Sequence, residues 1–153
     1  MALTHKSYDH VVWHNTWDPS IDPNWVLNYL IEFKDTWPNH RPEIEPKAKE
    51  GEVLSSFVLR SLTEGQLNRV DRMDGMDKIR EICAYGIISW SGLTTDSGEP
   101  REATHTKDSL GEKLTPSSLD FLNFFGFPDL PLMNILAVQI MSLTRSLTRS
   151  LKR

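Results

Sequence analysis

The chain has 153 residues, the length of one typical domain, and 39% of them are hydrophobic. Its net charge of −4 at pH 7 excludes the strongly basic class of proteins that coat nucleic acids, although it leaves room for a local basic patch. Cys83 is the only cysteine, which excludes an internal disulfide and a zinc site built from cysteines. The first residues form no apolar signal segment, and the longest apolar stretch falls short of the roughly 20 residues that span a bilayer. We therefore expect a soluble protein made in a cytoplasm.

Tryptophan and proline are concentrated near the start of the chain. Four of the five tryptophans lie in the first 37 residues, and five of the nine prolines fall between residues 19 and 46. Because proline fixes φ and donates no backbone hydrogen bond, this spacing predicts an extended arm over residues 1–50. The arm contains one short helix, which begins at Asp22-Pro23 and ends before Pro38, since Asp and Pro are typical of an N-cap and a first helical position.

The large aromatic side chains of this arm need to be covered, because exposed rings of this size are unfavourable in water. In one interpretation the arm packs on its own domain. In the other it binds a neighbouring subunit, and burying each large side chain then contributes about 1.5–3 kcal/mol. The second interpretation is our prediction, and the partner-binding residues are Trp13, Trp17, Trp25, Tyr29, Phe33 and Trp37.

The remainder, residues 51–153, has the apolar spacing of a helical domain. Residues 53–60 predict a short strand or an extended segment. Thr63-Glu64-Gly65-Gln66 fits a capping box, which opens a short helix, and Asp74-Gly75 predicts the turn that follows it.

Three further helices are predicted after this turn. Apolar residues at helical spacing predict a helix over residues 76–90, and the polar, glycine-rich residues 91–114 predict a loop. Thr115-Pro116 begins the next helix, which stops at Gly126, and a long last helix begins near Pro131. The predicted fold class is therefore mainly α: a small helical domain, an extended Trp- and Pro-rich N-terminal arm and at most one short strand.

The C-terminus repeats a Ser-Leu-Thr-Arg pattern with a period of four residues. On a helix such a period gives a leucine stripe beside a basic stripe. The predicted C-terminal contact residues are the cations of this stripe: Arg145, Arg149, Lys152 and Arg153. They either offset the helix dipole, for about 0.3–1 kcal/mol each, or contact an acidic partner surface or DNA phosphate.

Two groups of residues suggest metal binding at first inspection. His10 and His14 have a spacing that suits two ligands on one helix face, with Asp9 and Asp18 nearby, but these residues do not look helical and no third ligand is evident. Four acids resemble calcium ligands but are spaced by three or four, which is typical of a solvated helix face: Asp71, Asp74, Asp77 and Glu81. We predict no metal and no cofactor.

Cys83 is the one candidate nucleophile, with His105 as its base. The neighbours of Cys83 place it on an apolar helix, where burial raises the pKa of a thiol and makes it unreactive. The sequence contains no glycine-rich phosphate loop and no nucleophile elbow. We therefore predict no catalytic residues and no enzymatic activity.

Three stretches carry a family resemblance over about two thirds of the chain. They are Phe57-Val58-Leu59-Arg60-Ser61-Leu62-Thr63, then Gly86-Ile87-Ile88-Ser89-Trp90-Ser91-Gly92-Leu93 with the turn Asp96-Ser97-Gly98-Glu99, and a late helix from Ile135 to Thr144. Together they resemble a group of small tailed-bacteriophage proteins. The resemblance implies a helical accessory protein of phage morphogenesis, either a tail-assembly chaperone or a minor virion component, without catalytic residues. The Trp-rich arm and the basic tail depart from the pattern of that group and look like anchors in a permanent assembly.

From these features we expect a non-enzymatic virion protein that docks on other phage structural proteins in the capsid, neck or tail. We expect it to be made in the host cytoplasm, to be part of a homo- or hetero-oligomer and to contact no membrane. A transient tail-assembly chaperone is the first alternative. The second is a small DNA-binding or regulatory protein that uses Arg145–Arg153.

Overall fold

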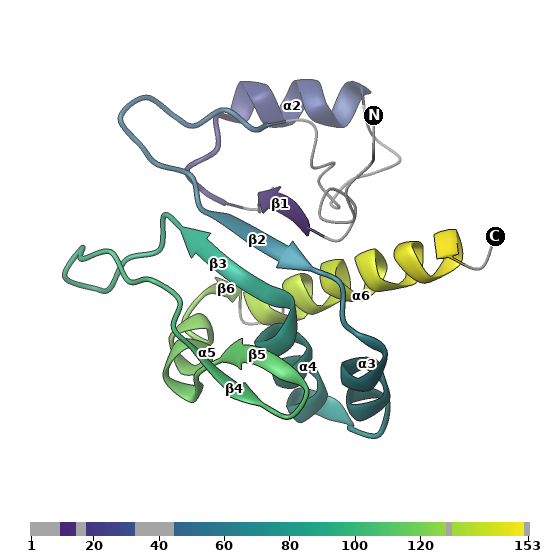
Figure 1. Ribbon diagram of the computed structural model, residues 1–153. Helices are drawn as coiled ribbons and strands as arrows, with labels where there is room; N and C mark the ends of the chain where they lie inside the picture. Colours follow the sequence, from purple (N-terminus) through teal and green to yellow (C-terminus); the bar gives the residue numbers. More distant parts are fainter. Residues whose placement is uncertain (1–9, 15–17, 33–44, 128–129, 152–153) are drawn as a thin grey trace, which may run out of the picture. The chain divides into compact units, whose positions relative to one another are not determined.

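The computed structural model describes residues 10–14, 18–32, 45–127 and 130–151 (Figure 1). Contacts along the chain group it into two compact units, both discontinuous in sequence. Unit 1 comprises residues 1–11, 59–88 and 103–153, and unit 2 comprises residues 12–58 and 89–102. This grouping differs from a boundary at residue 50, because residues 51–58 and 89–102 belong with the N-terminal part.

The structure has a mixed α/β fold, so the prediction of a mainly α fold with at most one short strand is wrong. The described helices are α2 (Pro23–Glu32), α3 (Glu64–Asp71), α4 (Gly75–Gly86), α5 (Pro116–Leu122) and α6 (Leu132–Leu151). The described strands are β1 (His10–His14), β2 (Ser56–Arg60), β3 (Ile87–Ser91), β4 (His105–Asp108), β5 (Gly111–Leu114), β6 (Gly126–Phe127) and β7 (Leu130–Pro131). They form a three-stranded sheet in the order β1-β2-β3 and two antiparallel pairs, β4-β5 and β6-β7.

The predicted helix over residues 76–90 is two elements in the structure, α4 and then β3. The helix ends at Gly86, and the next residue, Ile87, already has extended dihedral angles of φ −97° and ψ 117°. A Cβ at Gly86 would lie 2.5 Å from side-chain atoms of Ile140, so this position lies directly against α6. Ile87, Ile88 and Trp90 are β-branched or aromatic residues that suit a strand, and their spacing also matches a helix. The spacing of the apolar residues therefore predicted the end of the helix four residues too late.

The predicted loop over residues 91–114 contains the hairpin β4-β5. Its register pairs His105 with Leu114 and Asp108 with Gly111. Gly111 has a φ of +121°, which favours glycine, and the Leu110 N–H donates to Asp108 Oδ1 at 2.8 Å across the turn. Because most of the hairpin side chains are polar, it lacks the apolar alternation that indicates a half-buried strand.

Several predicted elements are confirmed. The short strand near residues 53–60 is β2, and the last helix begins one residue after Pro131. The capping box at α3 is complete: Thr63 Oγ1 accepts from the Gln66 N–H at 3.3 Å, and Gln66 Oε1 accepts from the Thr63 N–H at 3.0 Å. Thr115 is the N-cap of α5, with Pro116 at the first helical position.

The core of unit 1 lies where α4 packs on α6. The buried residues of these two helices include Ile82, Cys83, Leu136 and Ile140. A polar contact joins α6 to the segment between β2 and α3, because Thr144 of α6 is buried and its Oγ1 accepts from the Leu62 N–H at 2.9 Å and donates to the Ile140 carbonyl at 2.8 Å.

Unit 2 is held by aromatic packing and by hydrogen bonds between distant segments. The carboxylate of Asp18 accepts from the Ser55 N–H at 3.1 Å and from the Ser55 hydroxyl at 2.8 Å. Ile21 and Ala48 form a β-bridge, and the Trp90 Nε1–H donates to the Arg101 carbonyl at 2.7 Å. Asp18, a potential metal ligand in the sequence, thus serves as an acceptor within the fold.

Over the described residues, no helix combines the length and the apolar character that a membrane crossing requires.

Candidate functional site

The aromatic residues predicted to contact a partner are partly buried by the chain itself. Trp13, on β1, is 1% exposed, and its ring centroid lies 6.1 Å from that of Phe57. Tyr29, on α2, is 3% exposed and stacks on the half-buried Trp25 with centroids 4.9 Å apart. The structure therefore lends no support to a partner contact at Trp13 or Tyr29. The other predicted contacts lie outside the described residues: Trp17, Phe33 and Trp37.

The opposite side of α2 presents aliphatic side chains to the surface. Leu27 is 57% exposed and Ile31 is 71% exposed. They are four residues apart and therefore share one face of the helix. Glu32 is the only charged residue of α2. A helix that is apolar on most of its circumference is normally buried, so this exposed aliphatic face is a candidate protein-binding surface.

Of the four cations in the predicted basic stripe, the structure describes the side chain of one. Arg145 is exposed on α6. Arg149 belongs to the same helix, but the structure describes its backbone alone, and Lys152 and Arg153 lie outside the described residues. The contact of these cations with a partner or with DNA stays a prediction.

His10 and His14 lie at the two ends of β1, in a strand and not in a helix. Within residues 10–14, 18–32, 45–127 and 130–151, no cluster of three or more His, Cys, Asp or Glu side chains is arranged to hold a metal ion.

Cys83 is fully buried on α4, as its apolar neighbours predict. Its thiol donates to the Met133 carbonyl at 3.3 Å, and burial raises the pKa of the thiol well above its ordinary value. The reactive thiolate is therefore not formed at neutral pH. His105 lies near a backbone carbonyl instead, with Nε2 3.3 Å from the oxygen of Ile87.

The acidic residues of α3 and α4 divide into two groups. Asp71, Asp74 and Asp77 are exposed, as the prediction of a solvated face requires. Glu81 instead forms ion pairs with Arg69 of α3 at 2.9 Å and with Lys113 of β5 at 3.1 Å. Glu81 thereby links two elements that are distant in the sequence.

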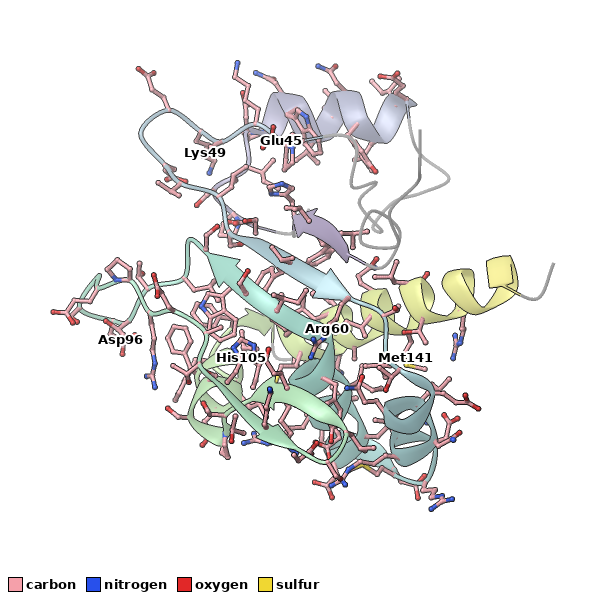
Figure 2. All side chains as sticks on the ribbon, viewed as in Figure 1. Glu45, Lys49, Arg60, Asp96, His105 and Met141 are labelled. Atoms are coloured by element: carbon pink, nitrogen blue, oxygen red, sulfur yellow. The ribbon has the colours of Figure 1, made fainter. Side chains whose placement is uncertain are left out.

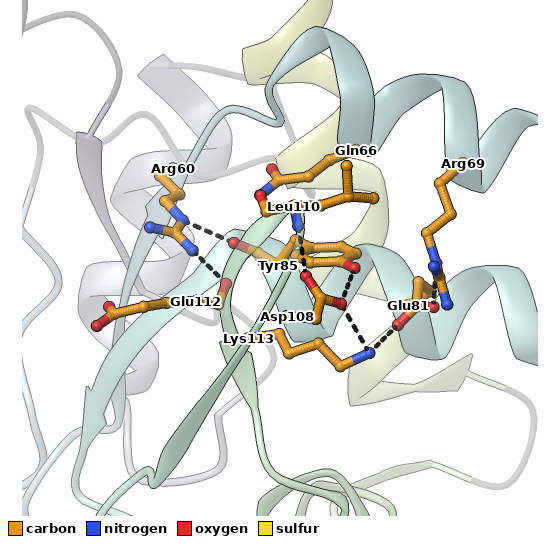
Figure 3. A network of polar contacts seen from close by, with 9 residues as sticks. All are labelled: Arg60, Gln66, Arg69, Glu81, Tyr85, Asp108, Leu110, Glu112 and Lys113. Atoms are coloured by element: carbon orange, nitrogen blue, oxygen red, sulfur yellow. Dashed lines mark hydrogen bonds and ion pairs between the residues drawn. The ribbon is translucent and has the colours of Figure 1, made fainter.

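Figure 3 shows that Glu81 belongs to a larger network around Tyr85. The Tyr85 side chain is almost entirely buried, and its hydroxyl donates a 2.6 Å hydrogen bond to Asp108 Oδ2 at the end of β4. Burial, and then this hydrogen bond to a carboxylate, raise the pKa of Tyr85 well above its ordinary value of 10. The same bond lowers the pKa of Asp108, as do the Leu110 N–H and the ammonium of Lys113, 3.5 Å away.

Two further side chains bind backbone carbonyls around this network. Arg60 donates from Nε to the Tyr85 carbonyl and from Nη2 to the Glu112 carbonyl, both at 2.7 Å. Gln66 of the capping box donates from Nε2 to the Leu110 carbonyl at 2.8 Å. The network as a whole fastens the hairpin β4-β5 to α3 and α4 (Figure 3), and its geometry gives it a structural role.

An open groove of about 470 Å³ lies between α3 and the turn of this hairpin. We call it the α3 groove, and its lining residues are Gly65, Asn68, Arg69, Arg72, Met73 and Leu110. Gly65, Asn68 and Arg69 lie on one face of α3, and Arg72, its C-cap residue, continues the same spacing. A smaller hollow of about 250 Å³ lies between α4, β5 and the start of α5, with Arg80, Glu81 and Lys113 among its lining residues.

Comparisons with protein-family models, with curated proteins and with solved structures give no match to this chain.

Proposed function

We propose that the chain is a non-enzymatic structural or assembly protein of a tailed phage, which works by binding other virion subunits. The support for a phage role is the resemblance of residues 57–151 to small tailed-phage proteins. The support for a binding role is the exposed aliphatic face of α2.

Parts of the three stretches that carry the resemblance fall in unit 1 and pack against one another there. The Leu62 N–H of the first stretch donates to Thr144 of the third, and Gly86 of the second lies against Ile140 of the third. Stretches that carry a resemblance and that meet in one core are consistent with a common architecture. This packing supports the use of the resemblance as a guide to function.

The observation that carries the binding role is the pair Leu27 and Ile31. The aromatic side of α2 faces the chain, with Tyr29 buried, so the aliphatic side is available to a partner. Two large aliphatic side chains on one exposed helix face are typical anchors for a groove on another protein. We therefore transfer the proposed partner contact from the aromatic rings to this face.

The test uses the double variant Leu27→Asp/Ile31→Asp in the phage that encodes the chain. We expect mass spectrometry to detect the wild-type chain in purified mature particles and to find at least about a tenfold loss of the double variant, because two carboxylates oppose burial of this face. The urea midpoint of the purified variant should stay close to that of the wild type, since both side chains are exposed.

The matched control is Asn24→Asp/Asn28→Asp, which adds the same charge at two exposed positions of the same helix. The control should be incorporated like the wild type. A chain that is required for tail formation but absent from mature particles would be a transient tail-assembly chaperone and would overturn the virion role. Equal incorporation of both double variants would exclude the α2 face as the contact.

A further inference from the structure

The α3 groove combines a cationic wall with an apolar floor. The guanidinium of Arg72 has no hydrogen bond or ion pair with another described side chain. Arg69 uses its Nε for Glu81. Met73 and Leu110 supply the apolar surface, while the nearby acids Glu64 and Asp71 are not among the lining residues. Such a groove suits a carboxylate next to an aliphatic side chain, since guanidinium groups bind carboxylates with two parallel hydrogen bonds.

The chain itself presents a segment of this chemistry in unit 2. The exposed residues Glu50-Gly51-Glu52-Val53, which we call the acidic loop, carry two carboxylates and a valine that is 77% exposed. Gly51 has a φ of +78°, which favours glycine. The loop follows Lys49, which is labelled at the surface in Figure 2.

Hydrogen bonds on both sides hold the acidic loop in place. Before it, the Lys49 N–H donates to the Ser20 carbonyl and the Asp22 N–H donates to the Lys47 carbonyl, both at 2.8 Å. After it, Ser55 is bound twice by the Asp18 carboxylate. A loop that is fixed at both ends loses little conformational entropy when it binds, so its exposed valine is presented in a form ready for a partner.

We propose that the acidic loop of one copy of this chain docks in the α3 groove of a second copy. Glu52 pairs with Arg72, and Val53 lies on Met73 and Leu110. The contact joins two different surfaces, so it is heterologous and links copies head to tail. It is a small contact and is therefore weak, with assembly favoured at high local concentration. This self-association is independent of the proposed binding of other virion proteins through α2.

Sedimentation velocity of the purified full chain over a wide range of concentration tests the proposal. We expect reversible association for the wild type, which weakens as salt is added because the pairing is ionic. Arg72→Glu and Glu52→Arg should each weaken it by about tenfold or more, because each places like charges in contact. An equimolar mixture of the two variants should associate again, since the reversed loop of one meets the reversed groove of the other.

A matched control is Lys107→Glu, which makes the same charge change at an exposed position of β4 outside the groove lining and should leave the association unchanged. Far-UV circular dichroism checks that every variant is folded. A wild-type chain that stays monomeric at every concentration would overturn the proposal. So would association that survives Arg72→Glu but is lost in Leu27→Asp/Ile31→Asp, because copies would then meet through α2. Loss of association in Lys107→Glu to the same extent would also overturn it, because the loss would then be a general effect of charge.

Discussion

Thr144 is a polar residue that α6 buries against the loop after β2. It is 3% exposed, and its hydroxyl is both an acceptor for the Leu62 N–H and a donor to the Ile140 carbonyl. The hydroxyl thus satisfies a backbone donor that no strand or helix bond satisfies. The Ser-Leu-Thr-Arg repeat predicted a leucine stripe and a basic stripe. The buried hydrogen bonds are instead made by Thr144, the first threonine of the repeat.

Replacing Thr144 by valine keeps the shape of the side chain and removes this acceptor. The buried Leu62 N–H then lacks a partner, and we expect the free energy of unfolding to fall by about 1–3 kcal/mol. Urea unfolding followed by circular dichroism measures the change. Ser142→Ala removes a hydroxyl at an exposed position of the same helix and should change stability by no more than about 0.5 kcal/mol. Equal losses of unfolding free energy in both variants would show that the hydrogen bond to the Leu62 N–H does not contribute to stability.

At the scale of secondary-structure elements, the hairpin β4-β5 is attached to α3 and α4 mainly by polar contacts. Tyr85, Glu81 and Gln66 each bind a residue of the hairpin or of its turn. A network of this kind fixes one arrangement, because each group would be left unsatisfied in another. Its ionisable members also make the attachment depend on pH.

The carboxylate of Asp108 should contribute to stability at neutral pH and lose that contribution in acid. Its pKa in the folded chain is lowered from 3.8, chiefly by the hydrogen bond from Tyr85. A lowered folded-state pKa means that the contribution is present above the unfolded-state value and is lost as pH falls through the folded-state value. Asp108→Asn should therefore be less stable than the wild type at neutral pH, and the difference should shrink in acid.

Urea midpoints measured across the acidic range test this dependence. Asp96→Asn, which changes an exposed carboxylate outside the network, is the matched control. Tyr85→Phe should reduce the acid dependence as well, because it removes the donor that lowers the Asp108 pKa. A difference between wild type and Asp108→Asn that is the same at every pH would contradict the role of the charge.

Local signals in the sequence were sufficient for some elements and insufficient for others. The capping box at Thr63 and the start of α5 at Thr115 depend on neighbouring residues, and both were predicted correctly. The hairpin β4-β5 has polar side chains, and its attachment joins residues such as Glu81 and Lys113 that lie 32 positions apart. No local pattern contains that pairing, so the mainly α prediction missed it.

The candidate sites show the same division. The four-residue spacing of Leu27 and Ile31 is visible in the sequence, but which side of α2 faces outward depends on the burial of Tyr29. Leu110 lines the α3 groove although it lies 44 positions after Gln66 in the sequence. A hydrogen bond from the Gln66 side chain to the Leu110 carbonyl joins the two residues. Surfaces made by distant segments follow from the tertiary fold and not from a motif.

At the scale of the whole molecule, the two compact units carry different spectroscopic signals. All five tryptophans fall within the residue ranges of unit 2, whereas α3, α4, α5 and α6 belong to unit 1. Tryptophan fluorescence therefore reports on unit 2, and the helical signal in far-UV circular dichroism reports mainly on unit 1. The chain thus has a separate natural probe for each unit.

These probes test whether the units unfold together. The boundaries between the units fall inside β1, β2 and β3, so each of these strands contributes residues to both units. We expect one cooperative transition, with coincident urea midpoints by fluorescence and by circular dichroism. A fluorescence midpoint at clearly lower urea would mean that unit 2 unfolds first and that the strands do not couple the units. The variant Thr144→Val, which acts on unit 1, sharpens the test, because coupled units require it to shift both midpoints by the same amount.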